Sequence, residues 1–353
     1  MASLYDKIYG CLAASRVGSA MGAAVECWTP EQIQQKYGYL DSLEAYPHYG
    51  ERGIDWMRPP GTTEDGIERQ KLFVAAIEEK GGRIDIRDFG QTAARLTDIE
   101  HMRFMTEPND QRLMHLIKQG VPASEVGRLT SWSGLISVAR ASHPIGLINA
   151  GDPTAAARDV REVGLFCFPP TDVSHDWSAI YAAATAEACK PDATVESVVD
   201  TAGRFATPRI RPELERALKI AAEHRAYEPF RDEFYRHYCG CGGNYPFSSA
   251  CEIVSKSFAV FVRVNGDAKQ AILDAVSFGR DTDCLAATAG GLAGALSGVD
   301  ALPQEWIRTV DEATMANPHT NRRTTIAQDA TAIHDALKKR AIEARRLIDL
   351  VGN

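Results

Sequence analysis

Two short acidic clusters stand far apart in the chain, Thr63-Glu64-Asp65 and Asp281-Thr282-Asp283. Carboxylates packed together repel one another unless a cation neutralises them, and oxygen atoms are the ligands that hard divalent ions prefer. The two clusters together therefore predict a site for magnesium or manganese and, with it, a metal-dependent hydrolase. The alternative is that each cluster only caps a helix, since Thr and Asp are among the preferred cap residues.

Both clusters are expected at the starts of helices. Residues 284–297 carry almost no charge and are rich in Ala and Gly, which suits a helix packed closely inside a core. Residues 67–79 form another helical run directly after the first cluster. An acid in the first helical turn is favoured by the helix dipole and by the free backbone N–H groups at that end.

Helical periodicity dominates the rest of the chain, and alternating strand patterns are scarce. The predicted helices span residues 5–25, 67–79, 175–189, 194–205, 212–225, 249–264, 267–278, 284–297, 304–316 and 325–350. The last of these is amphipathic, with apolar residues spaced among many charges, and we expect it to pack on the surface of the bundle. The sequence thus predicts an all-α fold.

Composition argues against several function classes. Hydrophobic residues make up 44% of the 353 residues, enough for a sizeable core, and a net charge of −8 without a basic patch argues against a nucleic-acid partner. The N-terminus lacks the regions of a signal peptide, and no apolar stretch is long enough to cross a bilayer. We expect a soluble, cytoplasmic protein without a membrane partner, with most of its eight cysteines reduced and buried. The absence of a Gly-x-Ser-x-Gly elbow and of a Walker A motif argues against a serine hydrolase and an NTPase.

The order of these motifs resembles the ADP-ribosylglycohydrolase superfamily, of which this chain would be a divergent member. The family's glycine-rich helix ending in a Glu is similar to residues 10–26, and its Thr-Asp-Asp-Thr motif is similar to residues 63–66. Its Gly-Gly-Asp-Thr-Asp-Thr motif resembles residues 279–284, the most specific match. The resemblance runs from about Leu4 to about Gly298. The superfamily includes the hydrolase that removes ADP-ribose from dinitrogenase reductase.

This resemblance implies a single domain over residues 1–353, a compact orthogonal helical bundle with a cleft for two metal ions, usually magnesium and otherwise manganese. The metal ligands that it implies are Thr63, Glu64, Asp65, Asp281, Asp283 and Cys284. It also implies a catalytic role for Glu26, as an acid/base or positioning group, and for Asp65. In the family, an activated water attacks C1 of a ribose, and the glycosidic bond breaks through an oxocarbenium-like state.

The chain departs from the family pattern at four positions near these motifs. Glu64 stands where the family has aspartate, Gly66 and Cys284 replace threonines, and Arg280 replaces a glycine. Magnesium binds thiolates poorly, so Cys284 is expected to weaken one metal site, to leave its ligand position to a water, or to tune the site toward manganese. Arg280 adds a cation that clamps a phosphate or carboxylate of the substrate or, alternatively, bonds a neighbouring acid for structure.

Substrate recognition is the part in which the chain departs most from the family. Where typical members carry Gly-Asn-Gly-Ser-Ala-Met-Arg before Pro-Ile-Gly, this chain has the altered stretch 133–143 before Pro144-Ile145-Gly146. Besides Arg280, the substrate-binding candidates are His143, His175 and Asn244. Each has a structural alternative, because a lone His is more often packed or on the surface, and Asn244 with its aromatic neighbours is equally suited to the core.

Three functions therefore stay open. The first is hydrolysis of an ADP-ribosylated protein or small ribosylated molecule, and the second is hydrolysis of a free nucleoside or other small N-riboside at the same site. The third is a catalytically silent binder of ADP-ribose or a nucleotide. The altered residues 133–140 weaken the case for ADP-ribose in particular, whereas the retained acids Glu26, Asp65, Asp281 and Asp283 favour catalysis. The sequence indicates neither the aglycone nor the oligomeric state.

Overall fold

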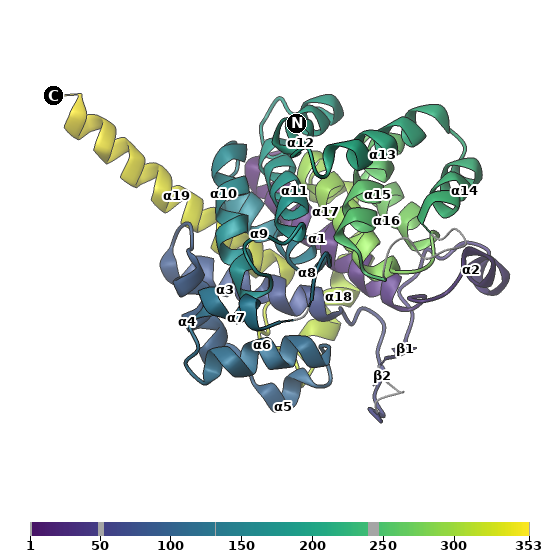
Figure 1. The fold of residues 1–353 in the computed structure, drawn as a ribbon, viewed down its shortest axis with the longest axis horizontal. Coiled ribbons are helices and arrows are strands. Elements are labelled where there is room, and N and C mark those ends of the chain that lie inside the picture. The colour runs from purple at the N-terminus through teal and green to yellow at the C-terminus, as the bar shows by residue number, and fades with distance from the viewer. Residues whose placement is uncertain (1, 49–52, 131, 239–246, 353) are drawn as a thin grey trace.

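The computed structural model describes residues 2–48, 53–130, 132–238 and 247–352, and these residues are predominantly helical (Figure 1). The α-helices are α1 (Leu4–Ala23), α2 (Pro30–Tyr37), α3 (Asp65–Lys80), α4 (Ile86–Leu96), α5 (Ile99–Met102), α6 (Pro108–Lys118), α7 (Ala123–Val126), α8 (Ser137–Ala141), α9 (His143–Ile148), α10 (Pro153–Val163), α11 (Ser174–Ala188), α12 (Val195–Phe205), α13 (Arg211–Glu223), α14 (Tyr227–Tyr238), α15 (Ala250–Arg263), α16 (Ala268–Val276), α17 (Thr282–Ser297), α18 (Gln304–Ala316) and α19 (Ile326–Val351). Short 3-10 helices are η2 (Gly127–Leu129), η3 (Gly164–Phe166) and η4 (Val299–Ala301).

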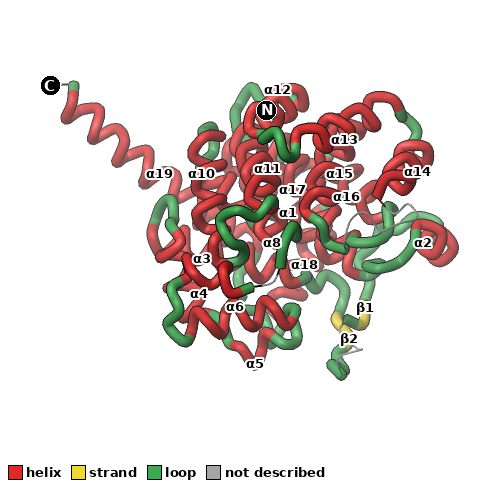
Figure 2. Tube along the Cα trace, viewed as in Figure 1, coloured by secondary structure: helices red, strands yellow, loops and turns green. Residues whose placement is uncertain are grey.

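Two very short strands, β1 (Tyr46–Pro47) and β2 (Met57–Arg58), pair antiparallel, with Tyr46 opposite Arg58 (Figure 2). The predicted all-α class is therefore confirmed. Each of the ten helices that the sequence predicts is present, with ends within two residues of the predicted ones. The prediction lacks α4, α6, α10 and α14, which are 11 or 12 residues long, and each buries only one face.

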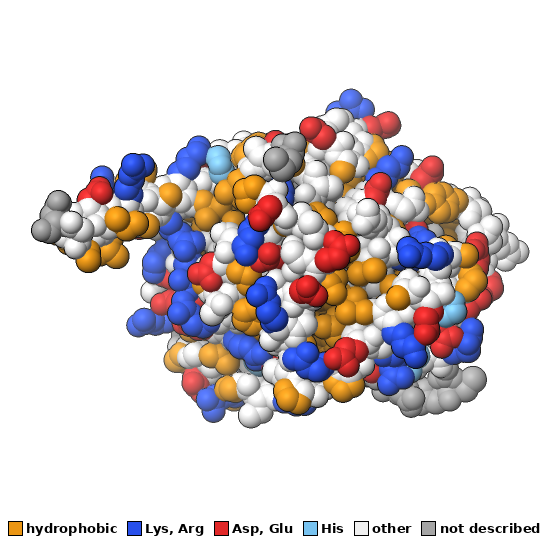
Figure 3. All heavy atoms as spheres, turned by 90° about the horizontal axis from the view of Figure 1, so that it is seen from above, with side chains coloured by type: hydrophobic (Ala, Val, Ile, Leu, Met, Phe, Trp, Pro, Cys, Tyr) orange, Lys and Arg blue, Asp and Glu red, His pale blue; other side chains and the backbone are white. Residues whose placement is uncertain are grey.

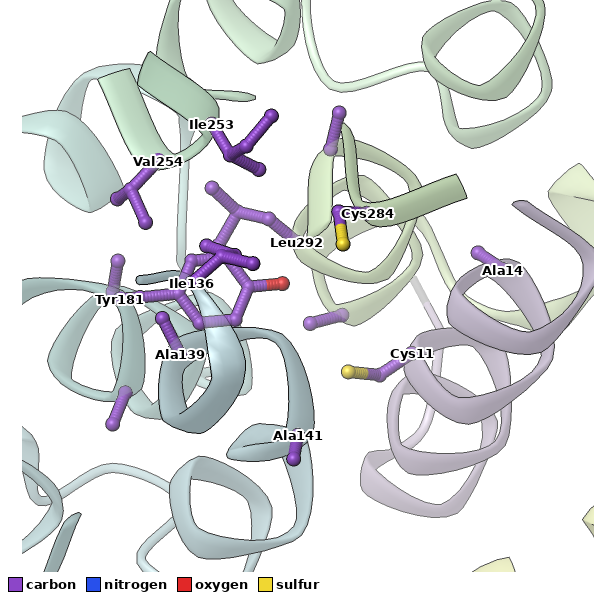
Figure 4. Packing of buried hydrophobic residues seen from close by; sticks show 14 of the residues in the cluster. Cys11, Ala14, Ile136, Ala139, Ala141, Tyr181, Ile253, Val254, Cys284 and Leu292 are labelled. Carbon is purple, nitrogen blue, oxygen red and sulfur yellow. The ribbon is translucent and has the colours of Figure 1, made fainter. Parts of the chain in front are cut away.

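Helices α1 and α17 form the centre of the bundle and pack directly on each other (Figure 1). Glycines make this contact close. A Cβ on Gly18 would lie 2.3 Å from the carbonyl oxygen of Ala286, and a Cβ on Gly22 would lie 2.5 Å from the backbone of Thr282. Figure 4 shows Cys11 of α1 and Leu292 of α17 in the surrounding core. This packing brings the C-terminal end of α1 to the N-terminal end of α17.

Helix α19 packs against α1, α3 and α9 with its first part only. Ile326, Ala330 and Ile333 are buried, and Arg340 donates a hydrogen bond to the carbonyl oxygen of Ile148. Residues 341–351 are exposed, and this end of the helix projects from the body (Figures 1 and 3). The predicted packing on the bundle surface thus extends to about Arg340. Within the described parts of the chain, no helix combines the length and the apolar character needed to span a membrane.

Candidate active site

Three helix ends bring the predicted acidic residues together. Glu64 is the N-cap of α3 and Asp65 its first residue, while Asp281 is the N-cap of α17 and Asp283 lies in its first turn. The prediction that both clusters open helices is confirmed. Glu26 follows the end of α1, which the glycine contacts hold against the start of α17. The acids of the two clusters, 216 residues or more apart in sequence, therefore meet in one place.

A pocket opens over these helix ends. Its lining consists of Glu26, His48, Glu64, Asp65, Arg69, Glu107, Trp132, Leu135, Ile136, Ser137, Arg140, Ser248, Asp283 and Cys284. The segment before α8 closes one wall, because the N–H of Ile136 donates to the carbonyl of Ser248 at 2.8 Å and the N–H of Ala250 donates to that of Gly134 at 2.8 Å. The residues that replace the family's Gly-Asn-Gly segment therefore form part of the pocket wall.

Asp281, Asp283 and Cys284 form one group whose ligand atoms lie within 4.8 Å of one another. Both carboxylate oxygens of Asp281 and Oδ1 of Asp283 are buried and have no hydrogen-bond partner among the described residues. Buried carboxylate oxygens without partners cost free energy that a hard cation would recover. Burial also raises the pKa of the Cys284 thiol, so this sulfur is a weak ligand beside the two carboxylates. The group fits one divalent cation held by Asp281 and Asp283.

Glu26, His48 and Glu64 form a second group with the same spread of ligand atoms. His48 Nε2 lies 3.1 Å from Glu64 Oε2, and its Nδ1 lies 3.7 Å from Glu26 Oε2. An imidazole among carboxylates suits manganese or another transition ion better than magnesium. His48 was absent from the predicted ligands, since nothing in its sequence context marks it.

The Glu64 carboxylate is held by other residues as well. Its Oε1 accepts a hydrogen bond from Tyr46 at 2.5 Å and one from Arg58, both fully or nearly fully buried. Tyr46 belongs to β1 and Arg58 to β2, and the two residues are paired across the strands. Arg58 and His48 hold the pKa of Glu64 below its usual range against the effect of burial. Glu64 is therefore a paired, charged carboxylate in the wall of the pocket.

Arg140 connects the two acidic clusters. Its Nη1 donates to Asp65 Oδ1 at 2.6 Å, and its Nη2 donates to Asp283 Oδ2 and to the Ser19 hydroxyl at 3.2 Å. Asp65 is also paired with Arg69, at 3.3 Å between Nη2 and Oδ2. Although burial acts to raise the pKa of Asp65, Arg69 and Arg140 hold it well below its usual range. Asp65 is thus fully charged and held by two guanidinium groups.

The pKa values of Glu26 and Asp283 are shifted in the opposite direction, upward. Burial, together with the charges of Asp283, Asp281 and Glu64, raises the pKa of Glu26 well above its usual range. Burial and the neighbouring Asp281 and Glu64 likewise raise the pKa of Asp283, in spite of Arg140. One pocket therefore holds carboxyl groups that retain a proton beside carboxylates that do not. Such pairs mark acid/base chemistry in many active sites.

The other predicted site residues have different surroundings. Arg280 donates to both carboxylate oxygens of Glu252 and is not part of the pocket lining. His143 is fully buried, with Nδ1 3.2 Å from Gln70 Nε2 and Nε2 2.8 Å from Tyr181 Oη. His175 Nε2 lies 3.1 Å from the carbonyl of Pro169, and its ring is buried away from the pocket lining.

Two further predictions concern Thr63 and Asn244. Thr63 is buried beside Glu64 but does not line the pocket. Asn244 lies outside the described residues.

A wider pocket of about 590 Å³ adjoins the acidic one and shares Glu26, His48 and Glu107 with it. Its other lining residues include Trp28, Lys36, Tyr37, Tyr46 and Phe247. The Lys36 ammonium lies 5.0 Å from the ring centre of Trp28 and 4.8 Å from that of Tyr37. The volume of the wider pocket falls within the usual range for small-molecule sites, about 300–1,000 Å³. The acidic pocket thus continues into a space with aromatic faces and a cation.

A sequence model of the ADP-ribosylglycohydrolase family matches residues 1–343. The chain belongs to this family. As a member, it is a hydrolase that acts on glycosidic bonds. The acidic pocket lies where the motifs that resemble the family meet, so family membership and geometry identify the same part of the molecule.

Curated relatives and a solved structure agree with this membership. The ADP-ribosyl-[dinitrogen reductase] glycohydrolase of Rhodospirillum rubrum is 24% identical over 315 residues, covering 88% of this chain and 92% of that protein. The uncharacterized protein YegU of Escherichia coli (strain K12) is 24% identical over 317 residues, covering 84% and 89%. A solved ADP-ribosylglycohydrolase-related protein complex shares the fold, with a TM-score of 0.66 and 16% identity over 95% of this chain and 99% of that one.

Proposed function

We propose that this member of the ADP-ribosylglycohydrolase family removes ADP-ribose from an ADP-ribosylated protein or small molecule, with a divalent cation at the acidic pocket. The observation that carries the proposal is the continuity of two pockets. The acidic pocket offers buried carboxylates to a ribose, and the wider pocket offers Trp28, Tyr37 and Lys36 to the remaining nucleotide. An aromatic face suits a base, and an ammonium suits a pyrophosphate.

Asp281 and Asp283 are the residues that would hold the cation, because three of their buried oxygens have no partner among the described residues. A bound divalent cation would orient ribose hydroxyls and lower the pKa of a coordinated water. Manganese suits the pocket better than magnesium, since a His48 nitrogen lies beside Glu26 and Glu64 and the Cys284 sulfur lies beside Asp281 and Asp283. The identity of the metal belongs to the proposal.

Glu26 is the residue that we assign to proton transfer. Its side chain is 18% exposed and lines both pockets, so it faces the place where the bond at ribose C1 would lie. Its raised pKa lets it hold a proton near neutral pH and give it to the leaving group. The charged carboxylate of Asp65 stabilises the positive charge developing on the sugar ring. Arg140 fixes Asp65 in place and also donates to Asp283.

Hydrolysis of a free nucleoside or small N-riboside is the second candidate. It is favoured by the pocket wall at Leu135, Ile136 and Ser137, which presents two apolar side chains and a hydroxyl where the family's Gly-Asn-Gly segment is replaced. The same acids would act on the ribose in this case. The wider pocket would then contact only a small aglycone, so its aromatic residues would matter little.

The test is release of product from a panel of ADP-ribosylated peptides, NAD-derived compounds and nucleosides, with manganese, magnesium or a chelator. The Asp281→Asn variant removes a buried carboxylate without hydrogen-bond partners among the described residues, and the exposed Asp300→Asn variant is the control. Release of ADP-ribose that is lost in Asp281→Asn and kept in Asp300→Asn supports the proposal. Release of free ribose from nucleosides alone supports the second candidate. Binding of ADP-ribose without turnover of any substrate would indicate a silent binder.

A further inference from the structure

The position of Arg140 is the starting point. Its side chain is 3% exposed and lies between the two acidic clusters, with one guanidinium nitrogen on Asp65 and the other on Asp283. The same second nitrogen also contacts the hydroxyl of Ser19, on the inner face of α1. Arg140 therefore stands as a fixed cation between a residue of α3 and a residue of α17.

Gly66 provides the space that this arrangement requires. A Cβ at Gly66 would lie 2.4 Å from both Cδ and Nε of Arg140 and 2.7 Å from its Cζ. Real Cβ atoms do not approach other heavy atoms this closely, so any larger residue at position 66 would displace the Arg140 side chain. Position 66 follows Asp65 directly in α3. The absence of a side chain at Gly66 thus leaves the space that the positively charged Arg140 side chain occupies.

The remaining carboxylate oxygens divide into two sets. Asp65 Oδ1 and Asp283 Oδ2 are occupied by Arg140, and Glu64 Oε1 is occupied by Tyr46 and Arg58. The buried oxygens that stay without partners among the described residues belong to Asp281 and to Oδ1 of Asp283. The group of Glu26, His48 and Glu64 is paired within itself, since Glu64 Oε2 lies 3.1 Å and Glu26 Oε2 lies 3.7 Å from ring nitrogens of His48. The buried oxygens of Asp281 and Asp283 are therefore the set left to coordinate, and a divalent ion between Asp65 and Asp283 would meet the positive charge of Arg140 and oxygens already in use.

We infer that the guanidinium of Arg140 takes the place of one of two cations, so that this chain binds a single divalent cation, at Asp281 and Asp283. The inference rests on the proposed function in one respect, the presence of a metal at the acidic pocket. It differs from the expectation of two metal ions that the sequence motifs raise. The Gly66 and Arg140 pair is the physical cause of the difference.

The experiment measures manganese rather than activity. The full chain is stripped of metal, loaded with excess Mn²⁺ and desalted, and the bound manganese per chain is then counted by elemental analysis. Electron paramagnetic resonance of the same sample distinguishes an isolated Mn²⁺ from a spin-coupled pair, since paired ions in two-metal sites lie about 3.5–4 Å apart. For the wild type we expect one ion per chain and the spectrum of an isolated ion.

Two variants test the cause. Arg140→Met removes the positive charge, and Gly66→Thr displaces the guanidinium by steric overlap while keeping it in the chain. Both are expected to raise the manganese content from one to two ions per chain and to produce a coupled spectrum. Arg16→Met removes another buried arginine, paired with Asp329, and Gly203→Thr adds a side chain where nothing lies within 4 Å. These two controls are expected to keep one ion.

The outcomes separate this inference from the proposed function. Two coupled Mn²⁺ ions in the wild type would overturn the inference and leave the proposed hydrolysis standing. One ion in the wild type and in both Arg140→Met and Gly66→Thr would also overturn it, because the guanidinium would then not be the reason. No bound Mn²⁺ in the wild type, together with hydrolysis in the presence of a chelator, would overturn both this inference and the metal dependence of the proposed function.

Discussion

Arg280 donates to both carboxylate oxygens of Glu252, with Nε 3.0 Å from Oε1 and Nη2 2.9 Å from Oε2. This pair joins the loop before α17 to the first turn of α15, and Glu252 is also paired with Lys256. The backbone of Arg280 has a φ of 63°, in the left-handed region that a glycine adopts more easily. The structure therefore supports the structural alternative for Arg280 over a contact with substrate.

The first prediction is that Arg280→Met lowers stability without changing substrate affinity. Loss of two charge-assisted hydrogen bonds to a buried carboxylate should lower the free energy of unfolding by about 1–3 kcal/mol. The KM for an ADP-ribosylated substrate should stay within about two-fold of the wild-type value, because Arg280 makes no contact with substrate in this interpretation. Loss of a substrate contact worth about 1.4 kcal/mol would instead raise KM about ten-fold. Urea unfolding and steady-state kinetics measure the two quantities. A large rise in KM at unchanged stability would make Arg280 a substrate-binding residue after all.

Glu26→Gln is the subject of the second prediction. If Glu26 gives a proton to the leaving group, the amide should lower kcat by about 10²–10⁴-fold. The same change removes one of several carboxyl groups that repel one another, so the metal-free protein should be at least as stable as the wild type. Kinetics with manganese and thermal melts in a chelator check both parts. A kcat close to that of the wild type would remove Glu26 from the proposed chemistry.

The positions of the two acidic clusters could be predicted from sequence because their causes are local. Cap residues precede Ala-rich or apolar runs at both places, and the helices α3 and α17 begin where those patterns say. Close packing of α1 on α17 also has a sequence signature, the glycines at 18 and 22. These local causes are sufficient to bring Glu26 near Asp281 and Asp283. The extent of a single domain over residues 1–353 stays a prediction.

The cations of the site could not be predicted in the same way. Arg140 is 75 residues from Asp65 and 143 residues from Asp283, and its choice of partners depends on how α8 packs between α3 and α17. Arg58 reaches Glu64 only because β1 and β2 pair, and such short strands leave no periodic pattern. The short helices α4 and α6 were missed for a related reason, since amphipathic runs of this length need tertiary packing to become stable.

The third prediction concerns the wider pocket. If Trp28 stacks on the base of ADP-ribose, Trp28→Ala should raise KM for an ADP-ribosylated peptide about 10-fold, from the roughly 1–3 kcal/mol that base–aromatic stacking contributes. The KM for a simple riboside should hardly change, because a small substrate would not reach the ring. Tyr39→Ala, at an exposed tyrosine outside the pocket, is the control. Equal effects of Trp28→Ala on both substrates would favour the riboside as the natural substrate.

The fourth prediction concerns His143 and the pH dependence of stability. Burial, assisted by the positive charges of Arg140 and Arg16, lowers the pKa of His143 from an ordinary value near 6.5 to about 3. The hydrogen bonds agree with a neutral ring, since Gln70 Nε2 donates to Nδ1 and the carbonyl of Ala287 lies 3.2 Å from Nε2. In the unfolded chain His143 takes up its proton near pH 6.5, whereas in the folded protein it does so only near pH 3. The unfolded state therefore binds more protons between these values.

The contribution of the neutral His143 ring to the free energy of unfolding is thus fully present above about pH 6.5 and is lost as the pH falls toward 3. Within this range the loss from one site amounts to at most about 1.4 kcal/mol per pH unit. In His143→Gln this contribution is absent, so the free energy of unfolding of the variant should fall less steeply below pH 6 than that of the wild type. Urea unfolding at several pH values measures the two slopes, with His115→Gln, at an exposed histidine, as the control. Parallel curves for wild type and His143→Gln would contradict a neutral, buried His143, and a steeper fall specific to the wild type would establish this core histidine as one source of acid sensitivity.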